Sequence, residues 1–132
     1  MKAKKILIID DDDRHLLTAK ELLEEEGYLV MTHNLGFGST NIIKAVRPDL
    51  VLLDVNMPAL SGDKLAAVIS GQEATRNIPI VFYSSNDEDS LRRSVRETRV
   101  AGYICKGNIL DLKNKVAHYL EQSGNSHIAG RY

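Results

Sequence analysis

The sequence predicts an α/β domain in which helices cover both faces of a five-stranded parallel sheet. Short aliphatic runs alternate five times with stretches of helical periodicity along the 132 residues. Three of these runs are almost continuously apolar, which is typical of parallel strands buried on both faces. A chain of this length fits one domain and buries enough surface to fold without a disulfide or a metal.

Five strands and five helices are expected in alternation. The strands are predicted at residues 5–9, 28–32, 50–53, 80–83 and 102–105. The helices are marked by apolar residues three or four positions apart, namely Leu16, Ala19, Leu22 and Leu23; Ile42, Ile43 and Val46; Leu65, Val68 and Ile69; Leu91 and Val95; and Leu112, Val116, Tyr119 and Leu120.

Capping residues delimit several of these helices. Gly27 ends the first helix, because glycine readily adopts the left-handed conformation that follows a helix. Ser39 is expected to cap the second helix and Pro48 to close it, while the fourth spans residues 87–98. Asn108 is expected to cap the fifth helix.

The C-terminal segment shows no hydrophobic periodicity. We therefore expect a single domain of residues 1–120, followed by a flexible tail or the start of a linker at residues 121–132. The chain contains no internal repeat and no low-complexity block.

Composition restricts the environment and the partners. A net charge of −1 gives no support for binding to nucleic acid or an anionic membrane. The single cysteine, Cys105, excludes an internal disulfide and suits a reducing compartment. The N-terminus is basic, but the apolar stretch behind it ends at Asp10, too early for a signal peptide or a membrane span. The cytoplasm is the expected location.

Aspartates follow two of the predicted strands. Asp10 and Asp11 come directly after the first strand, and Asp54 comes directly after the third. In the flavodoxin-like strand order 2-1-3-4-5 these strands are neighbours, and ligands bind where the strand order reverses between them. Three converging carboxylates about 5 Å apart repel by roughly 3 kcal/mol per pair at an effective dielectric near 20. Mg²⁺ would relieve this repulsion, and its presence beside an aspartate suggests phosphoryl chemistry.

Further polar residues occupy the same edge of the predicted sheet. Ser84 and Ser85 follow the fourth strand, and Lys106 follows the fifth. A hydroxyl and an ammonium thus join the acids at the carboxyl ends of the strands. Asp12 and Asp13, by contrast, are interpreted as acids that cap or begin the first helix.

With these residues in place, the chain resembles the receiver domain of two-component response regulators. The resemblance covers residue 4 to about residue 120, and the matching stretches are residues 8–12, 48–58, 61–62, 84 and 101–106. The spacings from Asp54 to Ser84 and from Ser84 to Lys106 also suit the family.

The resemblance implies a role for each acid. Asp54 would be the phosphoacceptor, attacking the phosphohistidine of a sensor histidine kinase or a histidine phosphotransfer protein to form an acyl phosphate. Asp11 would hold Mg²⁺ directly and Asp10 mainly through water, while Asn56 would offer its backbone carbonyl to the same ion.

The other residues would respond to the new charge. Ser84 would hydrogen-bond a phosphoryl oxygen, Lys106 would pair with the phosphoryl group, and Tyr103 would switch rotamer beside the fourth and fifth helices. Such a domain is a signalling module that promotes its own phosphorylation and dephosphorylation, not a conventional enzyme. Its output would be a changed contact between a downstream protein and the surface formed by the fourth helix, fifth strand and fifth helix. A homodimer through this surface is left open.

The chain departs from the family pattern near the site. Gly107 follows Lys106 where the family usually has proline, which makes this loop more flexible. Ser85 stands where a smaller alanine or glycine is common. Asn56 and Asn86 occupy positions that tune hydrolysis of the phosphoryl group in the family.

Two other functions remain as alternatives. A phosphatase resembling the haloacid dehalogenase superfamily would need a second acid two residues after Asp54, where this chain has Asn56. A degenerate receiver would serve only as a docking surface and take no phosphoryl group. Multiple turnover of a phosphate ester would favour the first alternative, and failure to accept phosphate would favour the second.

Overall fold

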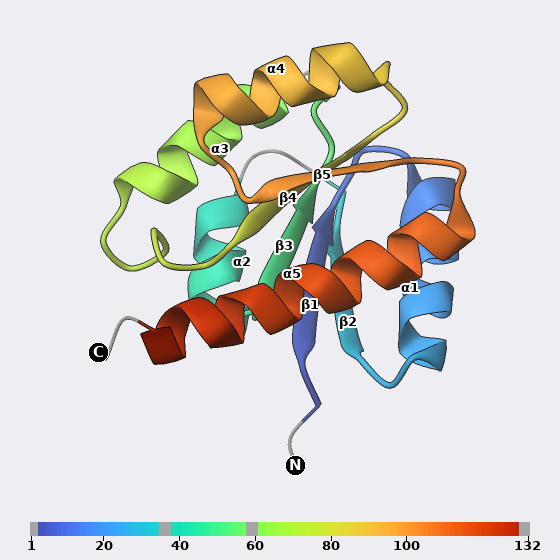
Figure 1. The fold of residues 1–132 in the computed structure, drawn as a ribbon, viewed down its shortest axis with the longest axis horizontal. Coiled ribbons are helices and arrows are strands. Elements are labelled where there is room, and N and C mark those ends of the chain that lie inside the picture. Colours follow the sequence, from blue (N-terminus) through green and yellow to red (C-terminus); the bar gives the residue numbers. More distant parts are fainter. Residues whose placement is uncertain (1–2, 35–37, 58–60, 130–132) are drawn as a thin grey trace.

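A computed structural model describes residues 3–34, 38–57 and 61–129, and its centre is one parallel sheet (Figure 1). The strand order is β2-β1-β3-β4-β5, as predicted. The strands are β1 (Lys5–Ile9), β2 (Leu29–His33), β3 (Leu50–Leu53), β4 (Ile80–Ser84) and β5 (Gly102–Cys105). Three strands have the predicted bounds; β2 lies one residue later than predicted and β4 extends one residue further, a difference within the usual uncertainty of strand ends.

In the described parts of the chain, five helices cover the two faces of the sheet. They are α1 (Asp13–Glu25), α2 (Ser39–Val46), α3 (Gly62–Gly71), α4 (Glu88–Thr98) and α5 (Ile109–Ala129). Figure 1 shows α1 and α5 on one face and α2, α3 and α4 on the other. Because side chains alternate along a strand, Ile6 and Ile8 of β1 pack with the α1 and α5 side, whereas Leu7 and Ile9 pack with the opposite side. The two cores explain why β1 is apolar at every position from Ile6 to Ile9.

The helix ends follow the predicted capping chemistry with one exception. Asp12 caps α1 by accepting hydrogen bonds from the backbone N–H groups of Arg14 and His15, and Asn108 Oδ1 accepts from the N–H of Asp111 at 2.9 Å. The prediction for Ser39 was wrong by one residue. Gly38, in a left-handed conformation with φ of 79°, precedes α2, and Ser39 is the first helical residue.

The C-terminal segment differs from the expected loose tail. The backbone of α5 continues past Leu120 to Ala129. Extending an existing helix costs much less than starting one, because each added residue gains a hydrogen bond without a new nucleation step. The helix therefore continues although the residues after Leu120 show no apolar stripe. The domain boundary at residue 120 remains a prediction. Across the described ranges, no helix has the length and apolar character needed to cross a membrane.

Candidate functional site

Three carboxylates converge at the carboxyl edge of the sheet, as the sequence predicted. The ends of β1 and β3 are paired, with Ile9 opposite Leu53, and the N–H of Asp54 donates to the carbonyl of Ile9 at 2.9 Å. One carboxylate oxygen each from Asp10, Asp11 and Asp54 lies within 4.8 Å of the other two. Asp10 is fully buried and Asp54 is only 5% exposed, so both carboxylates are held away from bulk water.

Lys106 brings a single positive charge to this cluster. Its Nζ lies 2.5 Å from Asp10 Oδ2 and 3.8 Å from Asp54 Oδ2. Burial raises the pKa of Asp54; the Lys106 ammonium lowers this pKa in part, and the Asp10 carboxylate raises it again. One ammonium facing three carboxylates leaves an excess of negative charge.

The site has the chemistry of a Mg²⁺ site. Asp10 Oδ1 accepts a hydrogen bond from the N–H of Asp12 at 3.0 Å, whereas the buried Oδ2 has the nearby ammonium but no well-directed hydrogen bond. Hard carboxylate oxygens are the ligands that Mg²⁺ prefers. The under-satisfied oxygen, together with the two neighbouring carboxylates, fits such a cation.

Amide side chains surround the hydroxyl of Ser84 beside the acids. Asn56 Nδ2 donates to Asn86 Oδ1 at 2.6 Å and to Ser84 Oγ at 3.4 Å, and the backbone N–H of Asn86 donates to the same hydroxyl oxygen at 3.2 Å. The backbone N–H of Asn56 also donates to Asp54 Oδ1 at 3.2 Å. This network links the ends of β3 and β4 across the site. Ser85 is exposed.

Two glycines shape the loops that carry the site. Gly62 donates its N–H to the carbonyl of Val55 at 3.0 Å, and a Cβ at this position would lie 2.6 Å from Val55 Cα. Gly107, the departure from the family pattern, has a φ of +95°, which only glycine adopts without strain. No peptide bond in the described parts of the chain is cis, so the Lys106–Gly107 bond is trans.

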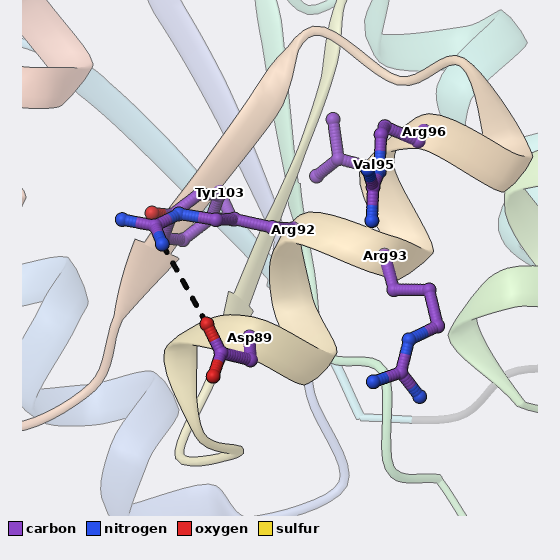
Figure 2. A pocket seen from close by; sticks show the side chains of 6 residues that line it. All are labelled: Asp89, Arg92, Arg93, Val95, Arg96 and Tyr103. Atoms are coloured by element: carbon purple, nitrogen blue, oxygen red, sulfur yellow. Dashed lines mark ion pairs between the residues drawn. The ribbon is translucent and has the colours of Figure 1, made fainter.

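Tyr103 connects β5 with α4 at one end of a surface pocket. Its hydroxyl donates to Glu88 Oε1 at 2.6 Å, and Lys115 Nζ lies 4.7 Å from the ring centroid. A pocket of about 570 Å³ lies here, and Figure 2 shows the side chains that line it: Asp89, Arg92, Arg93, Val95, Arg96 and Tyr103. Arg92 is paired with Glu88 at 3.3 Å and Asp89 at 3.6 Å.

Sequence reasoning missed one contact in the site. His15, in the first turn of α1, places its Nδ1 3.1 Å from Lys106 Nζ. The two residues are 91 positions apart, and only the position of His15 soon after Asp10 and Asp11 could have signalled the contact.

The fold and this group of residues are those of a signalling receiver domain, and comparison with protein families gives the same class. The family model described as the response regulator receiver domain matches residues 6–117. The chain belongs to this family and is a receiver domain of two-component signalling. That membership gives no support to the phosphatase alternative.

Known relatives and solved structures agree with this assignment. The chain is 32% identical over 108 residues to the sensor protein GacS of Pseudomonas syringae, covering 80% of this chain but only 12% of that protein. It is 24% identical over 102 residues to the polar-differentiation response regulator DivK of Brucella anthropi, covering 74% of this chain and 83% of the relative. The structure of chemotaxis protein CheY4 of Vibrio cholerae aligns with a TM-score of 0.82 at 21% identity, over 89% of this chain and 99% of CheY4.

Proposed function

We propose that this receiver domain accepts a phosphoryl group on Asp54 from the phosphohistidine of a sensor histidine kinase or a histidine phosphotransfer protein. The observation that carries the proposal is the nearly buried Asp54 carboxylate, grouped with two further carboxylates and the Lys106 ammonium. Asp10, Asp11, Asp54 and the backbone carbonyl of Asn56 would hold Mg²⁺. When bound, the ion supplies positive charge to the transferring phosphoryl oxygens.

In the transfer, a carboxylate oxygen of Asp54 attacks phosphorus while the bond from phosphorus to the donor imidazole nitrogen breaks. Phosphoryl transfer depends mainly on positioning and on neutralising charge. Lys106, now 3.8 Å from Asp54, pairs with the new negative charge, and the Ser84 hydroxyl donates to a phosphoryl oxygen. Hydrolysis by water later regenerates the Asp54 carboxylate, and the domain promotes both steps.

The present hydrogen bonds of Ser84 are compatible with this role. Its Oγ accepts from Asn56 and Asn86, so its O–H can donate to a phosphoryl oxygen while both contacts remain. A phosphoryl group adds nearly two negative charges and three acceptor oxygens, enough to favour a second loop arrangement.

The output surface would comprise α4, β5 and α5. Movement of Tyr103 would break its hydrogen bond to Glu88 and change one wall of the pocket in Figure 2. A downstream protein would read this change in the cytoplasm, and a second copy of the chain is the alternative occupant of the surface.

Intact-mass measurement after incubation with acetyl phosphate and Mg²⁺ tests the proposed function. We expect one labile phosphoryl adduct on the wild type and none on Asp54→Asn or on wild type treated with a chelator. If wild type binds Mg²⁺ but gains no adduct from either acetyl phosphate or a phosphorylated kinase, the domain acts only in docking.

A further inference from the structure

The imidazole of His15 contacts the ammonium on which the proposed phosphorylation depends. Its Nδ1 lies 3.1 Å from Lys106 Nζ, and it is farther from Asp10 Oδ2, at 3.9 Å, and from Asp12 Oδ2, at 3.7 Å. The backbone of His15 is held at the start of α1, where its N–H donates to the capping carboxylate of Asp12. Lys106 is therefore the closest polar partner of this ring nitrogen.

The contact determines which nitrogen of His15 carries a proton. An ammonium has three N–H donors and no acceptor, so Nδ1 must accept from Lys106 and the proton of the neutral ring must sit on Nε2. A protonated imidazole would place a second positive charge at 3.1 Å from the ammonium. In a hydrogen bond between the two groups, Lys106 is therefore the donor and His15 Nδ1 the acceptor.

Two contacts restrict the position of the ammonium beside the phosphoacceptor. Lys106 Nζ is paired with Asp10 Oδ2 at 2.5 Å, contacts His15 Nδ1 at 3.1 Å, and lies 3.8 Å from Asp54 Oδ2. The ion pair with Asp10 limits the distance of the ammonium but not its direction, so the hydrogen bond to His15 is the directional contact. Without His15, a flexible lysine side chain would rotate about its contact with Asp10.

We infer that His15 is a positioning residue for Lys106: it holds the ammonium beside Asp54, where the ammonium can pair with the phosphoryl group. This inference rests on the proposed function. His15 itself touches neither Asp54 nor the transferring group, and its effect passes through the lysine. Its side chain is 47% exposed, so replacing it should leave the fold intact.

Rates of phosphorylation by acetyl phosphate at saturating Mg²⁺ test the role in transfer. Loss of an ordinary hydrogen bond at a half-exposed side chain predicts that His15→Leu slows phosphoryl uptake by about two- to tenfold. His15→Asn, which keeps an acceptor near the position of Nδ1, should restore most of the rate, whereas His15→Gln places its amide one bond farther out and should not. His118→Leu, at an exposed histidine of α5, is the matched control and should match wild type.

A double-mutant cycle separates positioning from a structural effect. In a Lys106→Met background, His15→Leu should have no further effect on the rate, because the group that His15 positions is gone. An unchanged rate in His15→Leu, no recovery in His15→Asn, or an equal loss in the Lys106→Met background would each overturn the inference.

Nitrogen NMR of the His15 ring tests the contact without phosphorylation. At a pH where the ring is neutral, we expect the Nε2–H tautomer in wild type, and a shift of the Nδ1 resonance in Lys106→Met. If wild type takes up no phosphoryl group, the proposed function fails. The resonances of the His15 ring still show in that case whether His15 contacts Lys106. An Nδ1–H tautomer, or a resonance indifferent to Lys106→Met, would overturn the inference.

Discussion

The crowded carboxylates predict that the site lowers the stability of the metal-free domain. Asp54→Asn removes one negative charge while keeping the shape of the side chain. At an effective dielectric of 20, the repulsion between Asp54 and Asp10, whose oxygens lie within 4.8 Å, is about 3 kcal/mol. The attraction between Asp54 and Lys106 at 3.8 Å is about 4 kcal/mol on the same scale. The repulsion from Asp10 and the attraction to Lys106 nearly cancel. The burial of the Asp54 carboxylate and its repulsion from Asp11 remain, and both are unfavourable to the free energy of folding.

We therefore expect Asp54→Asn to raise the free energy of unfolding by about 1 kcal/mol at pH 7 without Mg²⁺, the usual scale for relieving strain at a functional site. The pKa of Asp54 is raised in the folded protein, chiefly by burial, so the folded state binds this proton more tightly than the unfolded state. Ionised Asp54 consequently destabilises the fold above its folded pKa. The advantage of Asp54→Asn should shrink as the pH falls to the ordinary value of 3.8 and below.

Urea unfolding followed by far-ultraviolet circular dichroism is a suitable assay, because the chain has no tryptophan. Asp89→Asn, at an aspartate whose side chain is 87% exposed, is the control and should change stability by less than about 0.5 kcal/mol. Added Mg²⁺ should stabilise wild type more than Asp54→Asn, since only wild type offers all three carboxylates. A less stable Asp54→Asn protein, or an advantage that persists unchanged at low pH, would refute this reasoning.

Three other substitutions have definite expected outcomes. Gly62→Ala would press its Cβ against the backbone carbonyl of Asp54, so chemical denaturation should show a loss of about 1–3 kcal/mol and phosphorylation should slow. Gly107→Ala forces alanine to a φ of +95° and should cost about 1–2 kcal/mol in the same assay. Tyr103→Phe removes the hydrogen bond that most lowers the pKa of Glu88, so carbon NMR should show that pKa rising toward 4.5; an unchanged pKa would contradict the contact.

Most of the fold was predictable because its signals are local. Continuous apolar runs marked β1, β3 and β4, and each of these strands is buried on both faces. The end of α5 was not predictable in the same way, since a helix can continue without burying an apolar stripe. Ser39 was misplaced as a cap because Gly38 takes the left-handed conformation just before it.

The site was predictable only where a residue directly follows a strand. Asp10 and Asp54 were placed correctly at the sheet edge because parallel strands β1 and β3 end together. The contact of His15 with Lys106 depends on how α1 and β5 are positioned in space, so no short sequence pattern contains it. The same limit applies to the hydrogen bond between Tyr103 of β5 and Glu88 at the start of α4, which are 15 positions apart.

Locating the phosphoryl group tests the central claim most directly. After incubation with acetyl phosphate and Mg²⁺, borohydride reduction would convert an aspartyl phosphate to homoserine, and peptide mass spectrometry would identify the residue changed. We predict homoserine at position 54 in wild type and no reduction product in Asp54→Asn. Reduction at another acid, or a stable phosphoryl group on a histidine with Asp54 unmodified, would contradict the account.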